Sequence, residues 1–252
     1  MKKTLIYPIG TTKACRYAVC YLGQEGFDIV DHPTPEVTHL LLDVPSFRTD
    51  GILRSGEMLQ PTLDMLPHDI TIIGGNLCCS ALSEYTIADL LTNADYLAQN
   101  AAITAECALQ IALPLLDTTL FETKCLILGW GRIGKFLSRL LSAARCPITV
   151  AARKEHDRAM IRALGLNAAD YPELSRNLSE YELIFNTVPS PILSAEKLAL
   201  CRNCVKIDLA SAPGLAGEDV IHARGLPGIH APKSSGKLIA DSVRDYIREA
   251  VS

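Results

Sequence analysis

Short apolar runs of strand length alternate along the whole chain with longer stretches in which apolar residues recur every three or four positions. This alternation is typical of a parallel sheet covered by helices on both faces, so the pattern predicts an α/β protein. The second half is the more regular. It predicts strands at 124–128, 148–152, 183–187 and 205–209, and helices at 133–144, 156–164 and 195–200.

The first half shows the same alternation less regularly, with prolines between the runs. It predicts an N-terminal doubly wound-like domain with strands at 4–7, 29–30, 39–44 and 70–73, and helices at 12–24, 53–65 and 83–91.

Two further helices bear on the domain organisation. The segment 101–116 is apolar on nearly every side, so we expect a buried helix that joins two domains. The segment 235–250 has one apolar stripe opposite a charged face. We therefore predict a substrate or partner domain at 1–98, an interdomain helix at 99–117, a dinucleotide-binding domain at 118–234, and a last helix, 235–250, that packs back on the first domain.

Charge and composition narrow the class of protein. In 252 residues, 24 lysines and arginines face 28 aspartates and glutamates, a net charge of −4, which offers no basic surface to a nucleic acid. The N-terminal apolar run stops at Pro8, too short for an export signal. The most apolar stretch is broken by Glu106 and Gln110 and is too short for a membrane span. We expect a cytoplasmic protein that acts on small molecules, without nucleic acid or membrane.

The cysteines predict neither disulfides nor a metal site. Their number, nine, is odd, and several lie inside apolar runs, where a thiol behaves as a small hydrophobe. Cys201 and Cys204 have the spacing of half a zinc site, and Cys78 is followed directly by Cys79, but neither pair has a further ligand nearby. We expect structural thiols in a reducing compartment.

The strand predicted at 124–128 is followed directly by a glycine motif that opens a helix. The motif G-x-G-x-x-G is formed by Gly129, Trp130, Gly131, Arg132, Ile133 and Gly134. In this setting the glycines permit a tight turn, close approach of a pyrophosphate and close packing of the helix on the strand, while the helix N-terminus supplies amide donors. The second half is therefore predicted to be a Rossmann dinucleotide-binding domain.

The residues at the end of the next strand determine whether NAD or NADP binds. An acid there holds the ribose 2′-hydroxyl of NAD, and a cation holds the 2′-phosphate of NADP. The segment 150–154 contains no acid and ends with Arg153 and Lys154, which predicts NADP. The alternative is that these are simply two solvated basic residues.

Ligands of open α/β sheets lie at the carboxyl ends of the strands. After Phe185, we expect Asn186, Thr187 and Pro189 to face the nicotinamide, the alternative being a structural turn or helix cap. Asp208 falls within the last predicted strand. A buried carboxylate needs hydrogen-bond partners, so we expect a structural or cofactor-orienting role for it.

From Asn100 to the C-terminus the chain resembles the family of the dipicolinate synthase A subunit. The resemblance rests on the segments 150–154, 181–189, 206–214, 225–228 and 231–233. It implies an NADP-dependent dehydrogenase that makes dipicolinate (pyridine-2,6-dicarboxylate) from a dihydro- or hydroxytetrahydro-dipicolinate in spore formation, together with a flavoprotein-like B subunit. Two alternatives stay open: a related dehydrogenase of another small acid, and a non-catalytic NADP-binding regulatory subunit of a flavoprotein partner.

This reaction requires loss of a proton besides the hydride, and Glu106 can accept it if desolvation raises its pKa. Thr104 lies two positions before it, on a different face of the helix; the alternative for this pair is a helix N-terminal cap. A dicarboxylate substrate needs a cation. Of Lys13, Arg48 and Lys233 we select Lys233, near the start of the last helix. Exposed apolar residues of the N-terminal domain predict a homodimer or a partner interface.

Overall fold

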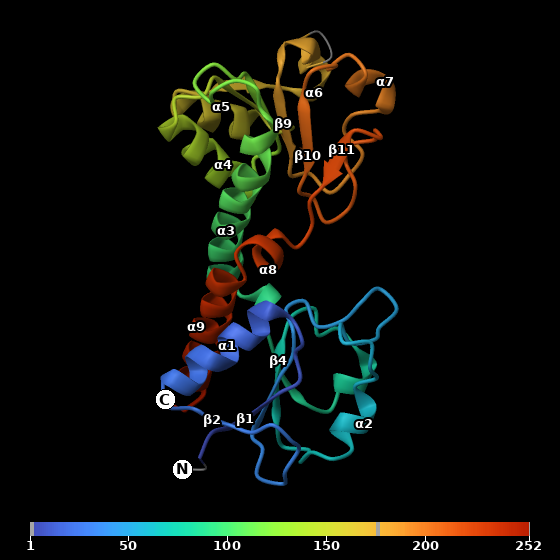
Figure 1. Cartoon of the computed structure of the whole chain (residues 1–252), viewed down its shortest axis with the longest axis vertical. Helices are drawn as coiled ribbons and strands as arrows, with labels where there is room; N and C mark the ends of the chain where they lie inside the picture. Colours follow the sequence, from blue (N-terminus) through green and yellow to red (C-terminus); the bar gives the residue numbers. More distant parts are fainter. Residues whose placement is uncertain (1–2, 175–176, 252) are drawn as a thin grey trace. The chain divides into compact units, whose positions relative to one another are not determined.

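The computed structural model describes residues 3–174 and 177–251 (Figure 1). The chain forms two compact units: one comprises the ranges Met1–Asn100 and Pro227–Ser252, and the other is Ala101–Leu226. Each unit contains one parallel sheet with helices packed on it, so the predicted α/β class is confirmed.

The sheet of the unit Ala101–Leu226, the second unit, has the strand order β11-β10-β9-β6-β7-β8, and all neighbouring strands are parallel. Its strands are β6 (Cys125–Leu128), β7 (Ile148–Ala151), β8 (Asn167–Ala169), β9 (Leu183–Asn186), β10 (Val205–Asp208) and β11 (Val220–His222). The chain moves from β6 outward to β8 and then crosses to β9 on the other side of β6. This reversal is a topological switch point, where open α/β sheets bind ligands.

Helices cover both faces of this sheet. They are α4 (Arg132–Ala143), α5 (Glu155–Ala163), α6 (Tyr171–Leu174) and α7 (Ala195–Leu198), with a short 3-10 helix, η4 (Leu178–Glu180). A further 3-10 helix, η3 (Leu113–Leu115), precedes β6 in the chain and has no buried residue. Leu126 and Leu128 belong to a buried cluster that includes Leu174 and Leu198 from α6 and α7. Ile127 points to the other face, towards α4. The strands and longer helices predicted here are confirmed to within a few residues.

The other unit, the first, has the strand order β2-β1-β3-β4-β5, again parallel throughout. Its strands are β1 (Leu5–Pro8), β2 (Asp28–Ile29), β3 (His39–Leu41), β4 (Thr71–Gly74) and β5 (Thr86–Asp89). Its helices are α1 (Lys13–Gln24), α2 (Gln60–Leu63), α8 (Leu226–His230) and α9 (Pro232–Val251), with 3-10 helices η1 (Ser80–Leu82) and η2 (Leu90–Thr92). A buried aliphatic cluster joins α2 to β3 and β4.

The C-terminal helix α9 packs along α1, as Figure 1 shows. A Cβ atom on Gly236 would lie only 2.6 Å from the carbonyl oxygen of Ala14, so the two helices approach as closely as a glycine permits. Further along, Arg244 pairs with Glu25 at 3.1 Å. The helices therefore run in the same direction, with their N-terminal ends together.

The helix α3 (Ala94–Ala112) starts well before the predicted Ala101. The side chain of Asn93 accepts a hydrogen bond from the amide of Tyr96 at 2.9 Å, the arrangement of a helix N-cap. Glu106 and Thr104 therefore lie in the middle of the helix, and the interpretation of this pair as an N-terminal cap is wrong. Within the described residues, no helix is both long and apolar enough to cross a bilayer.

Two predicted helices of the first unit are also wrong. Only Gln60–Leu63 of the segment 53–65 is helical, because Gly56 has a φ of 91° and Leu53 forms an isolated bridge with Phe47. The segment 83–91 contains the strand β5, which pairs with β4, instead of a helix. Such short apolar segments follow their tertiary partners more than their own propensity.

Gly236 provides a test of the α1–α9 contact. We expect Gly236→Ala to destabilise the chain by about 1–3 kcal/mol, because the added methyl overpacks the interface with α1. Gly228→Ala in α8 is the matched control, since a Cβ there meets nothing within 4 Å. Urea unfolding monitored by circular dichroism measures both. Equal stability of the two variants would contradict this packing.

Candidate dinucleotide-binding site

The turn between β6 and α4 is built on Gly129. Its φ is 104°, a conformation that residues with side chains rarely adopt, and its amide donates to the carbonyl of Ala151 at 2.9 Å. A Cβ here would also lie 2.8 Å from the side chain of Val188. Both the backbone and its surroundings therefore require glycine at this position.

The other two glycines of the motif differ in what surrounds them. A Cβ on Gly134 would collide with the carbonyl group of Gly129, so the missing side chain lets α4 pack against the strand. Gly131, the N-cap residue of α4, is exposed, and a Cβ there meets nothing within 4 Å. Its missing side chain serves no packing inside the chain and leaves the backbone open to a ligand.

The first turn of α4 favours an anion. It contains no acidic residue, and the first amides of a helix have no partner inside the helix. Around it, Arg132 is exposed, Ile133 is half-buried, and the half-buried Trp130 has the ammonium group of Lys135 5.7 Å from its ring centre. The turn therefore fits the pyrophosphate of a dinucleotide.

The end of β7 carries the predicted selector residues. Arg153 and Lys154 are both exposed, and Lys154 is the N-cap residue of α5. Neither forms an ion pair within 4.0 Å in the part of the chain that the structure describes. Two uncompensated positive charges thus lie at the carboxyl end of the strand that follows the glycine turn, which suits a phosphate monoester.

Asn186 and Asp208 form a buried network at the carboxyl ends of β9 and β10. The amide nitrogen of Asn186 donates to the carboxylate of Asp208 at 2.9 Å and to the carbonyl of Val188 at 3.1 Å, and its oxygen accepts from the amide of Val188. Asp208 also accepts three amides of the loop after β10, from Ala210, Gly214 and Leu215. The expected hydrogen bonding of Asp208 is observed, and Asn186 is occupied by protein groups instead of facing a ligand.

Thr187 and Pro189 lie beside this network. The amide and hydroxyl of Thr187 both donate to the carbonyl of Leu128, each at 2.9 Å, which joins the end of β9 to the glycine turn. Pro189 is exposed. Thr187 therefore helps to hold the turn in place.

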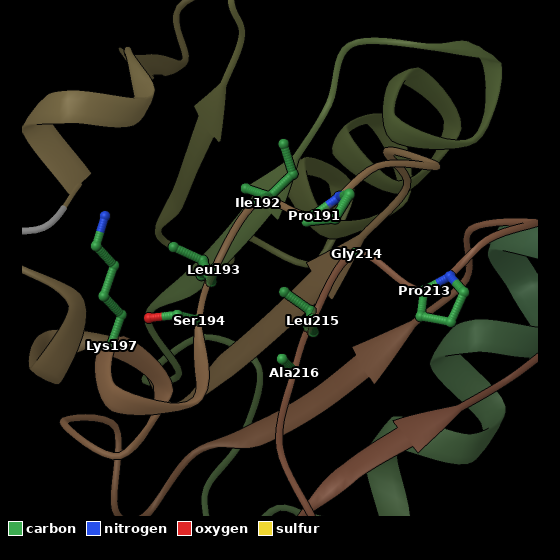
Figure 2. A pocket seen from close by; sticks show the side chains of 9 residues that line it. All are labelled: Pro191, Ile192, Leu193, Ser194, Lys197, Pro213, Gly214, Leu215 and Ala216. Atoms are coloured by element: carbon green, nitrogen blue, oxygen red, sulfur yellow. The ribbon is translucent and has the colours of Figure 1, made fainter.

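Gly214 was not predicted as a functional residue, although the site depends on it. A Cβ there would lie 2.7 Å from the carbonyl oxygen of Val188 and 2.8 Å from that of Ser190. The loops after β9 and β10 consequently touch, and a largely apolar pocket opens beside them (Figure 2). Its lining residues are Pro191, Ile192, Leu193, Ser194, Lys197, Pro213, Gly214, Leu215 and Ala216.

The predicted catalytic residues lie outside this network. Thr104 is buried on one face of α3, whereas Glu106 is exposed on another, so the desolvation expected for Glu106 is absent in the chain. Lys233 is the exposed second residue of α9, in the first unit. Because α1 and α9 start at the same end, Lys233 and Lys13 lie at one edge of that unit.

The cysteines are all free thiols. The thiol of Cys201 donates to the carbonyl of Leu178 at 3.1 Å, and burial raises the pKa of Cys204 to about 12. Within the described residues, no three Cys, His, Asp or Glu side chains are grouped so that they could hold a metal ion.

Substitutions of Gly131 and Gly134, the second and third glycines of the motif, should have opposite effects on binding and stability. We expect Gly131→Val to leave the free energy of unfolding within about 0.5 kcal/mol of wild type, because its surroundings are open, but to weaken dinucleotide binding at least about tenfold. Gly134→Ala should instead destabilise the fold. Calorimetric titration with NADP and urea unfolding separate the two effects. Unchanged binding in Gly131→Val would rule out this turn as the pyrophosphate site.

The chain resembles a known protein in sequence over most of its length. No protein-family model matches the chain. The A subunit of dipicolinate synthase from Bacillus subtilis (strain 168) is 27% identical over 259 aligned positions, which cover 89% of this chain and 86% of that protein. The relationship in sequence therefore extends over both units.

Solved structures share the fold. The crystal structure of the dipicolinate synthase A subunit from Bacillus halodurans has a TM-score of 0.84 at 22% identity, covering 98% of this chain and 99% of that one. An L-alanine dehydrogenase has a TM-score of 0.69 at 14% identity, covering 97% and 80% of the two chains. The sequence relative from Bacillus subtilis and the crystal structure from Bacillus halodurans confirm the predicted resemblance of the chain to the A subunit of dipicolinate synthase.

Proposed function

We propose that the chain is an NADP-dependent oxidoreductase of the dipicolinate synthase type. It oxidises a dihydrodipicolinate to dipicolinate by removal of a hydride and a proton; a hydroxytetrahydro-dipicolinate substrate loses a water molecule as well. The observation that carries the proposal is the open glycine turn after β6 with the two uncompensated cations, Arg153 and Lys154, at the end of β7. The similarity to the A subunit of dipicolinate synthase supplies the substrate class.

The residues present fit the cofactor. The open backbone at Gly131 and the amides of the first turn of α4 would bind the pyrophosphate, and Arg153 and Lys154 would bind the 2′-phosphate. The Asn186–Asp208 network holds the loops after β9 and β10, and Thr187 fixes the glycine turn to β9. When bound, NADP supplies the hydride acceptor.

The first unit is the substrate domain in this proposal. Lys233 binds one carboxylate of the substrate, since a dicarboxylate must be recognised by cations. Lys13 lies at the same edge, but the amides of Thr11 and Thr12 before it already donate to the carboxylate of Asp43. The N-terminus of α1 is therefore occupied by an internal anion, and side-chain cations remain for the substrate.

Glu106 is the proton acceptor in this proposal. Its carboxylate is exposed in the chain alone, so this proposal requires the bound substrate to shield Glu106 from water while it takes the proton released on oxidation. Thr104, two positions before Glu106, lies on the buried face of α3 and has a packing role in this proposal. In this proposal the reaction takes place in the cytoplasm of a spore-forming cell, and the chain associates with a flavoprotein-like B subunit or with a second copy of itself.

A turnover assay tests the proposal. The purified chain is incubated with NADP and freshly generated dihydrodipicolinate precursor, with and without a flavoprotein-like B subunit, and both NADPH and dipicolinate are followed. We expect the two products to rise together. NADP binding without either product would favour a regulatory role, and turnover of other small acids alone would favour a related dehydrogenase.

Substitution of Glu106 tests its role. We expect Glu106→Gln to lower kcat by about 100-fold, because the amide cannot accept the proton, with little change in the affinity for NADP. Gln110→Ala is the matched control, since Gln110 lies one turn further along the exposed face of α3. Steady-state kinetics measure both variants. A kcat for Glu106→Gln equal to that of the control would exclude Glu106 as the proton acceptor.

A further inference from the structure

The segment that presents Arg153 and Lys154 is held by one side chain, Arg158 of α5. Its Nη1 atom donates to the carbonyl of Ala152 at 2.7 Å and to that of Arg153 at 2.9 Å. The amide of Ala152 in turn donates to Ala169 in β8 at 3.1 Å. The backbone at the end of β7 is therefore tied to the sheet on one side and to Arg158 on the other.

The same guanidinium group holds the nearest acid. Nε of Arg158 donates to Oε2 of Glu155 at 3.0 Å, and Nη2 lies 2.7 Å from the same oxygen. The other oxygen of Glu155 accepts a hydrogen bond from Arg162. Hydrogen bonds from Arg162 and Arg158 lower the pKa of Glu155, and both of its oxygens are paired although its side chain is 65% exposed.

This arrangement matters because of where Glu155 lies in the chain. It follows Lys154 directly and is the first acid after β7. An acid at the end of this strand is what binds the ribose 2′-hydroxyl of NAD and repels a 2′-phosphate. Glu155 would therefore oppose Arg153 and Lys154 if it were free to turn towards the ribose.

We propose that Arg158 is a positioning residue for cofactor specificity: it draws Glu155 away from the ribose and fixes the backbone that presents Arg153 and Lys154 to the 2′-phosphate. The inference rests on the proposed function, since it concerns the same cofactor site. Arg158 itself is 17% exposed at its side chain and is occupied by the protein. It acts through its neighbours and does not touch the cofactor.

The test compares the dissociation constants of NADPH and NADH, measured by fluorescence titration, in wild type and variants. We expect Arg158→Met to lower the preference for NADPH about tenfold, because NADPH binds more weakly and NADH more tightly. The double variant Arg158→Met with Glu155→Gln should return NADH to its wild-type affinity. Glu155→Gln alone should change the preference less than about twofold, since Glu155 is already withdrawn.

Arg162→Met is the matched control. It removes the other partner of Glu155 but touches neither carbonyl of the selector segment, so we expect a smaller change than in Arg158→Met. If Arg158→Met does not fold, Arg158→Lys replaces it. Lysine keeps the positive charge but cannot bind the carboxylate of Glu155 and the two carbonyls at the same time. We therefore expect a preference for NADPH between those of wild type and Arg158→Met. An unchanged preference in a folded Arg158 variant, or an equal loss for both cofactors, would overturn the inference.

Failure of the underlying function gives a different result. If the wild-type chain binds neither cofactor, or binds both equally, the NADP assignment itself fails. If wild type prefers NADPH and the Arg158 variants keep that preference, only the role of Arg158 fails.

Discussion

Backbone amides at the carboxyl ends of parallel strands point into the connecting loops, where they need acceptors. Each unit meets this need with a buried carboxylate: Asp43 shortly after β3 and Asp208 at the end of β10, which are 4% and 1% exposed. Asp43 collects the amides and hydroxyls of Thr11 and Thr12, and Asp208 collects three loop amides and Asn186. A buried charge is tolerated only when it is fully satisfied, so both loop clusters are fixed in one arrangement.

Because the two carboxylates lie at different places in their sheets, the first strand-to-helix turn is closed to an anion in one unit and open in the other. In the first unit, Asp43 occupies the first strand-to-helix turn, where a phosphate would otherwise bind to the N-terminus of α1. In the second unit, Asp208 lies further along the sheet, and the corresponding turn at Gly131 stays open, with no acid in the first turn of α4. Two similar parallel sheets thus differ at the same turn: it is open to an anion in the second unit and occupied by an internal carboxylate in the first.

Local sequence patterns predicted the elements around the glycine turn because strand, turn and helix are adjacent in the chain there and each has its own signature. The patterns failed where contacts between residues far apart in the sequence determine the secondary structure. β5 is a strand because it pairs with β4, and Gly56 breaks a periodicity that otherwise resembles a helix. The positive charges of Arg153 and Lys154 are evident from the sequence. That the side chain of Asn186 already has hydrogen-bond partners is not evident, because its partner Asp208 lies 22 positions away. The exposure of Glu106 depends likewise on how α3 packs, which its sequence alone does not fix.

We propose that the open turn after β6 is the dinucleotide site and that the charges at the end of β7 select NADP. A crystal structure of the chain with NADP decides this. We expect the pyrophosphate on the amides that follow Gly129 and the 2′-phosphate within hydrogen-bonding distance of Arg153 and Lys154. A dinucleotide bound in the turn before α1, or a 2′-phosphate that contacts neither cation, would contradict it.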